Sequence, residues 1–144
     1  MILLEKRVKK GMIEEALKAF PDKCCGFVFG LESDNGDRVF SDFLPVEDVI
    51  ENNDTATFEI KPEEYIKAEV HAHETELNLL GIYFSHPNGN SQPDEADKAL
   101  ALPNFSYILL SMPEHQKIEI RSWQLNDAKE FEEELIYKTE NVQQ

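Results

Sequence analysis

The sequence has few cysteines, few basic residues and no long apolar run. Its 144 residues include two cysteines and 14 lysines and arginines against 29 aspartates and glutamates, for a formal net charge of −15. This excess of acids argues against nucleic acid and anionic membranes as partners, because both are bound through many Lys and Arg contacts. No run approaches the roughly 20 apolar residues of a membrane-spanning helix.

The two cysteines, Cys24 and Cys25, are adjacent. In a strand they would point to opposite faces, so a disulfide between them would be strained. The lack of a disulfide framework and of a signal-peptide pattern favours the cytoplasm. Cys25 precedes Gly26 and could be a nucleophile, but no base is tied to it by sequence. A small, buried apolar residue is the better interpretation.

Length and composition fit one domain over residues 1–144, with 41% apolar and 10% aromatic residues. Periodicity predicts an α/β fold with a mixed central sheet flanked by helices. We expect helices at 8–20, from 62 onward and at 93–102, strands at 25–30, 38–46, 55–60, 80–84, 107–110 and 118–125, a hairpin turn at 35–36, and a polar loop at 47–54. Residues 131–137 fit either a strand or a helix.

The helix that begins at Pro62 has an apolar stripe formed by Ile66, Val70, His73 and Leu77, which we expect to face the core. On this stripe, His73 is better explained as a core histidine than as a metal ligand. His71 lies two residues away and would not share its face; it is expected to face Thr75.

Residues 80–102 contain the strongest candidate for a functional site. An apolar run ends in His86, and a polar loop leads to Asp94 and Asp97 on an expected helix. His86 and Asp97 could bind one metal ion. A histidine two residues before His86 would share its strand face and add a second imidazole. That position holds Phe84, which cannot ligate a metal.

The spacing from His86 to Asp94 and Asp97 resembles the core motif of the JAMM/MPN metallopeptidase family: His-x-His, seven residues, Ser, two residues, Asp, with a distant preceding Glu. The segments FPDKCCGFVFG, ALPNFSYILLS and EIRSWQL also resemble family strands, so the resemblance covers roughly the whole chain. It implies a cytidine-deaminase-like architecture and zinc as the family cofactor. In the bacterial branch it further implies substrates that are C-terminal tails of ubiquitin-like sulfur-carrier proteins.

The chain departs from the family motif at three of its five functional positions. Phe84 replaces the first His, Asp94 replaces the Ser and Lys23 stands at the position of the catalytic Glu; His86 and Asp97 remain. We therefore expect absent or weak zinc binding, lost hydrolysis and retained binding of a ubiquitin-like or sulfur-carrier tail. The alternatives are a hydrolase using His86, Asp94 and Asp97 as ligands, and a structural subunit that only dimerises.

Lys23 has two interpretations. Its ammonium could replace the charge of the missing metal by pairing with Asp97, Asp94 or both, because carboxylates without a counter-charge are costly to bury. Alternatively, Lys23 is simply exposed. Ser85 is expected to face away from the site, between Phe84 and His86, which disfavours a serine hydrolase.

Overall fold

The computed structural model describes all residues except 21, 48, 53–56, 87–103, 115–116 and 138–144. The described elements are β1 (Ile2–Leu4), α1 (Lys6–Ala19), β2 (Cys25–Glu32), β3 (Arg38–Pro45), β4 (Val49–Asn52), β5 (Thr57–Ile60), α2 (Pro62–Thr75), β6 (Asn78–His86), β7 (Ser106–Glu114), β8 (Lys117–Leu125), β9 (Phe131–Glu134) and β10 (Ile136–Tyr137). The α/β class is confirmed. Neither described helix is long and apolar enough to cross a membrane.

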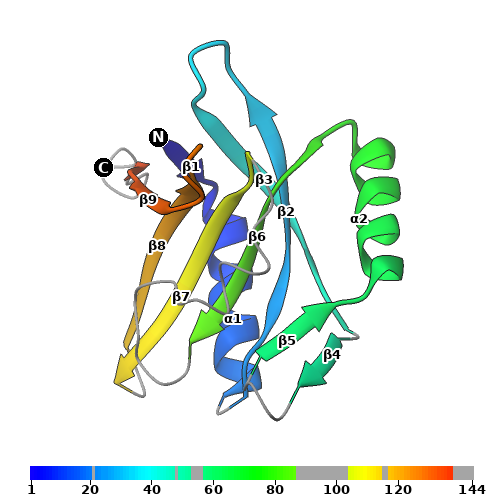
Figure 1. Cartoon of the computed structure of the whole chain (residues 1–144), viewed down its shortest axis with the longest axis vertical. Coiled ribbons are helices and arrows are strands. Elements are labelled where there is room, and N and C mark those ends of the chain that lie inside the picture. Colours follow the sequence, from blue (N-terminus) through cyan, green and yellow to red (C-terminus); the bar gives the residue numbers. More distant parts are fainter. Residues whose placement is uncertain (21, 48, 53–56, 87–103, 115–116, 138–144) are drawn as a thin grey trace.

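Eight strands form one mixed sheet in the order β10-β1-β3-β2-β6-β7-β8-β9, and β4 and β5 form a separate hairpin (Figure 1). The pairs β1–β10, β1–β3 and β6–β7 are parallel. Strands β9 and β10 follow each other in the chain but lie at opposite ends of the sheet order. Leu135 links β9 to β10, and its carbonyl accepts a hydrogen bond from the Ile2 N–H of β1 at 2.8 Å. The sheet is therefore nearly closed on itself.

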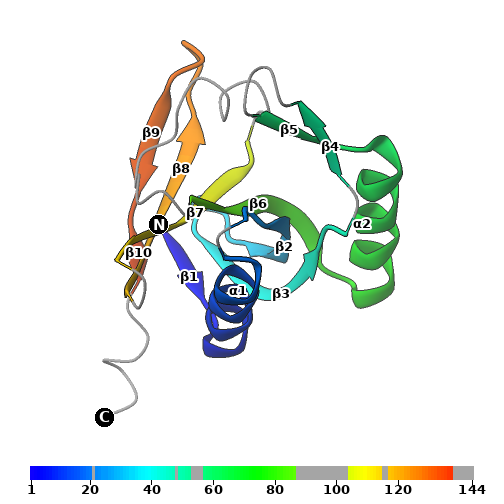
Figure 2. The same cartoon turned by 90° about the horizontal axis from the view of Figure 1, so that it is seen from below.

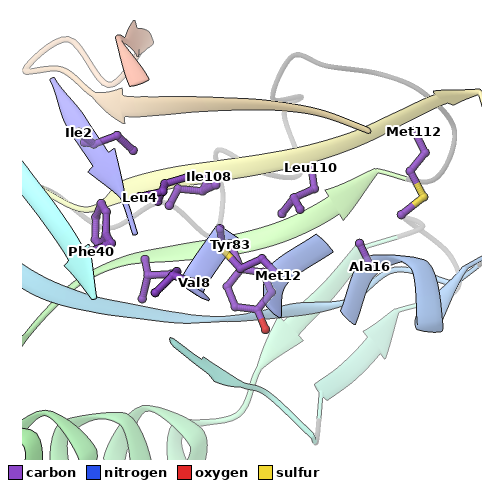
Figure 3. Close-up of a cluster of buried hydrophobic side chains, with 11 residues drawn as sticks. Ile2, Leu4, Val8, Met12, Ala16, Phe40, Tyr83, Ile108, Leu110 and Met112 are labelled. Atoms are coloured by element: carbon purple, nitrogen blue, oxygen red, sulfur yellow. The ribbon is translucent and has the colours of Figure 1, made fainter. Parts of the chain in front are cut away.

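The two helices cover opposite faces of the sheet (Figure 2), and each face has its own apolar cluster. The α1-face cluster (Figure 3) contains Ile2, Leu4, Val8, Met12, Ala16, Val28, Phe40, Tyr83, Ile108, Leu110 and Met112. The α2-face cluster contains Cys25, Phe27, Phe29, Ile60, Ala68, Ala72, Ile82, Phe84, Tyr107 and Leu109. Strand alternation explains this division, because successive side chains point to opposite faces.

The predicted inward face of α2 is wrong. Ile66 and Val70 are 64% and 51% exposed, whereas Ala68 and Ala72 are buried. The small alanine side chains allow the helix to lie close to the sheet. The Tyr65 ring of α2 also packs edge-on against the Phe27 ring of β2, with the ring centroids 5.2 Å apart. Close packing through small residues has decided the orientation here, against the larger apolar area of the opposite stripe.

Several strand predictions also need correction. The short β1 was not predicted, and part of the polar loop expected at 47–54 forms β4, which pairs with β5. Residues 131–137 form strands, since β9 pairs with β8 and β10 pairs with β1. The remaining strands overlap the predicted ranges, as does α1. The helix expected at 93–102 lies outside the described residues.

A buried arginine connects the β2–β3 hairpin to the beginning of β6 and β7. Arg38 is 5% exposed. Its Nε donates to Glu32 Oε2 at 2.7 Å. Its Nη1 donates to the Leu80 carbonyl at 3.0 Å and to Ser106 Oγ at 2.9 Å. Its Nη2 donates to the Asn104 carbonyl. Leu80 lies at a register shift between β2 and β6. Arg38 thus satisfies a backbone acceptor at this irregularity.

Candidate functional site

The candidate site lies where β6 and β7 end and β2 begins. His86 is the last residue of β6 and is 2% exposed. It pairs with Ser111 of β7 in a parallel ladder, so both residues lie toward the carboxyl ends of two adjacent parallel strands. Ligands commonly bind outside such strand ends in α/β sheets.

Phe84 is a core residue of the α2-face cluster. It lies between Cys25 of β2 and Leu109 of β7 in the sheet and is 3% exposed. Its ring centroid is 5.5 Å from that of His86 and 5.9 Å from that of Tyr107. These distances are typical of attractive aromatic pairs. The family position of the first metal ligand is therefore occupied by a packed aromatic ring.

Lys23 lies two residues before β2 and is exposed. The β2–β6 pairing extends toward it, because the Ser85 N–H donates to the Cys24 carbonyl at 2.9 Å and the Cys24 N–H donates to Ser85 Oγ at 2.8 Å. Lys23 is the residue that precedes this last hydrogen-bonded pair, and His86 is the residue that follows it. The segment that carries Lys23 therefore runs beside the end of β6, which carries Phe84 and His86, although the two segments are far apart in the sequence.

Asp94 and Asp97 lie outside the described residues, so the pairing of Lys23 with them stays a prediction. Among the residues that are described, no three His, Cys, Asp or Glu side chains gather where a metal ion could bind. Catalytic zinc is usually held by three protein ligands. The described part of the site offers the His86 imidazole. At the position of the family's first His it has the ring of Phe84, which cannot bind a metal. These residues do not fit the family zinc.

Burial makes Cys25 a poor nucleophile. It is 5% exposed. Burial raises the pKa of the Cys25 thiol to about 12, with smaller electrostatic contributions from Cys24 and Glu64. The pKa of Cys24 is also raised by burial. Since the thiolate is the reactive form, neither side chain is activated for catalysis.

The thiol of Cys25 should therefore resist alkylation in the folded protein. With a pKa of about 12, only about one Cys25 in ten thousand is a thiolate at pH 8. We expect iodoacetamide at pH 8 to modify Cys25 only after denaturation in urea, as measured by peptide mass spectrometry. Rapid modification of Cys25 in the folded chain would contradict this prediction.

Sequence reasoning missed a buried carboxylate near the site. Glu64, in the first turn of α2, is buried. Its Oε2 is 2.8 Å from Lys67 Nζ, and its Oε1 accepts the Glu47 N–H at 3.3 Å. An acid in the first turn of a helix is already explained by the helix dipole. The sequence therefore gives no reason to expect the contact of Glu64 with the Glu47 N–H. Glu64 fixes the beginning of α2 against the β3–β4 connection.

Of the other histidines, His71 and His73 lie on α2, and His115 lies outside the described residues. His71 Nε2 is 2.7 Å from Asp42 Oδ2, a contact that the expected pairing with Thr75 did not anticipate. The Thr75 hydroxyl instead donates to the His71 carbonyl at 2.8 Å. His73 is exposed, so the core interpretation is wrong. Its exposure follows from the orientation of α2.

Comparison with known proteins agrees with the fold. The model of the family Prok-JAB, prokaryotic homologs of the JAB domain, matches residues 5–126. A protein of Desulfitobacterium hafniense is 28% identical, with a TM-score of 0.81 and coverage of 95% of this chain and 92% of that one. A protein of Salinibacter ruber is 25% identical, with a TM-score of 0.72 and coverage of 94% and 90%.

A JAB1/MPN domain protein of Archaeoglobus fulgidus shares the fold at 15% identity, with a TM-score of 0.58 and coverage of 96% of this chain and 97% of that one. No curated protein matches the sequence. The family model spans most of the chain, and the solved structures cover nearly all of it. The chain therefore belongs to the prokaryotic homologues of the JAB domain, within the JAMM/MPN family that its motif resembles.

Proposed function

We propose that this chain is a JAB domain without hydrolytic activity that binds the C-terminal tail of a ubiquitin-like or sulfur-carrier protein. The observation that carries the proposal is the burial of Phe84 in the α2-face cluster, against His86 and Tyr107. A metal ligand at this position would have to present a nitrogen, oxygen or sulfur donor to the site, and the family's histidine would present a ring nitrogen. Phe84 instead contributes apolar packing, which supports a site kept for binding after loss of its metal chemistry.

The β4–β5 hairpin offers a place for such a tail. It forms a two-stranded sheet of its own, and neither strand pairs with another described strand. Ile60 of β5 packs in the α2-face cluster with Phe84 and Cys25, so the hairpin lies beside the site. An extended peptide can add to an open strand edge through backbone hydrogen bonds. We propose that the tail pairs with this hairpin and ends near His86.

A peptide with the last residues of a sulfur-carrier protein, ending in Gly-Gly, should bind and remain intact. Binding is measured by fluorescence anisotropy of the labelled peptide, and cleavage of a version extended beyond Gly-Gly is followed by mass spectrometry. A matched peptide with proline in its paired segment should bind about tenfold more weakly, because proline removes a backbone donor.

The protein for this experiment is purified without chelator, and its metal content is measured in the same sample. Stoichiometric zinc together with cleavage of the extended peptide would replace the proposal by the hydrolase that uses His86, Asp94 and Asp97. Equal affinity for the proline peptide would contradict pairing with the hairpin. Absence of binding would leave the structural-subunit interpretation.

A further inference from the structure

The side chain of Ser111 is completely buried and has an unsatisfied hydroxyl. Its exposed fraction is 0%, and its Oγ has no hydrogen-bond partner among the residues that the structure describes. Burying a hydroxyl without a partner is unfavourable, so such groups in folded proteins call for an explanation. One explanation is a partner that arrives with a ligand.

The position of Ser111 places its hydroxyl at the candidate site. On β7, Leu109 belongs to the α2-face cluster and Leu110 to the α1-face cluster. By strand alternation, Ser111 returns to the α2 face. His86 lies on that face too, since its ring contacts Phe84, and it is the ladder partner of Ser111. The unsatisfied hydroxyl is thus beside His86.

The other buried serines all have hydrogen-bond partners, although the Tyr83 hydroxyl and Trp123 Nε1 are also buried without one. Ser122 Oγ donates to Glu134 Oε2 at 2.6 Å, Ser106 Oγ accepts from Arg38 at 2.9 Å, and Ser85 Oγ accepts the Cys24 N–H at 2.8 Å. Among the four serines described as buried, Ser111 is the one without a partner. It is also the one on the same face as His86 at the strand ends.

We propose that Ser111 contacts the ligand directly: its hydroxyl donates a hydrogen bond to a backbone carbonyl oxygen near the end of the bound tail. This inference rests on the proposed function. Because Ser111 is 0% exposed in the free chain, the tail reaches its hydroxyl only by displacing the residues that cover it. Tail residues of the Gly-Gly type suit the position, because glycine has no side chain and needs the smallest opening. Ser111 then contributes to affinity for the tail, and its unpaired state belongs to the free protein.

The test compares Ser111→Ala with the matched control Ser122→Ala in the full chain. Each variant is measured for affinity to the Gly-Gly peptide by anisotropy and for thermal unfolding by circular dichroism. Ser111→Ala should bind about tenfold more weakly while its Tm stays equal or rises, because no internal hydrogen bond is lost. Ser122→Ala should unfold at a lower Tm and bind the peptide like wild type.

The outcomes separate this inference from the proposed function. Wild-type affinity in Ser111→Ala would overturn the role of Ser111 and leave tail binding intact. A fall in Tm as large as that of Ser122→Ala would also overturn it, because the hydroxyl would then have a partner within the protein. No binding by the wild-type chain would overturn both proposals.

Discussion

Replacing Arg38 with alanine should lower the free energy of unfolding by about 3–5 kcal/mol, the range found when one partner of a buried ionic network is removed. The guanidinium satisfies the carbonyls of Leu80 and Asn104 and contacts Ser106, and all of these lose their donor in the variant. Glu32 is 41% exposed and can be solvated, so the cost comes mainly from the buried acceptors. Urea unfolding followed by circular dichroism measures the change.

Arg7→Ala is the matched control for this prediction. Arg7 also contacts an acid, with its Nη2 3.5 Å from Asp42 Oδ1, but its side chain is 64% exposed. Exposed ion pairs contribute about 0–1 kcal/mol, so this variant should unfold close to wild type. If Arg38→Ala were as mild as Arg7→Ala, the network around Arg38 would not hold the beginning of β6 and β7 as described.

The triple variant Lys23→Glu, Phe84→His, Asp94→Ser should gain zinc binding. The substitutions restore the family motif, and the contact of Phe84 with His86 on one sheet face shows that an imidazole at position 84 would lie next to His86. Together with Asp97, two imidazoles provide three ligands for zinc. At zinc concentrations 100-fold above Kd, binding should add about 2.7 kcal/mol to stability and raise Tm by about 5–10 °C.

The control carries Phe84→Ala in place of Phe84→His, with the other two substitutions unchanged. It has the same altered charges but lacks the second imidazole, so zinc should not raise its Tm. It should also be less stable than wild type by about 3–5 kcal/mol, because the ring leaves a cavity in the α2-face cluster. A folded triple variant that takes up no zinc would contradict the site geometry, including the expected participation of Asp97.

Much of the fold could be predicted because its signals are local. Pro62 marks the beginning of α2, and Val8, Met12 and Ala16 recur at helical spacing on the buried face of α1. The turn at Asn35-Gly36 is confirmed, with Gly36 at φ +91°. The inward face of α2 could not be predicted. Ile66 and Val70 gave the stronger apolar pattern, but the fit of Ala68 against the sheet depends on tertiary geometry that no local pattern contains.

The site was predictable in part for the same reason. The motif spacing identified His86 and the replacement of the family's first His by Phe84. The register of β2 and β6 pairs Phe84 with Cys25, two residues after Lys23. The contact of Glu64 with the Glu47 N–H, the pairing of His71 with Asp42 and the unsatisfied hydroxyl of Ser111 carry no sequence signal. Each depends on residues from distant segments: Asp42 and His71, for example, are 29 residues apart in the chain.

The pairing of β1 with β10 bears on how the chain folds during synthesis. Ile2 is the ladder partner of Ile136, so one side of β1 cannot pair until nearly the whole domain has left the ribosome. Contacts between residues so distant in sequence form slowly. Until then the nascent chain holds a strand with an unpaired edge, which can pair with other chains. Closure of the sheet is therefore a late event in the folding of this chain.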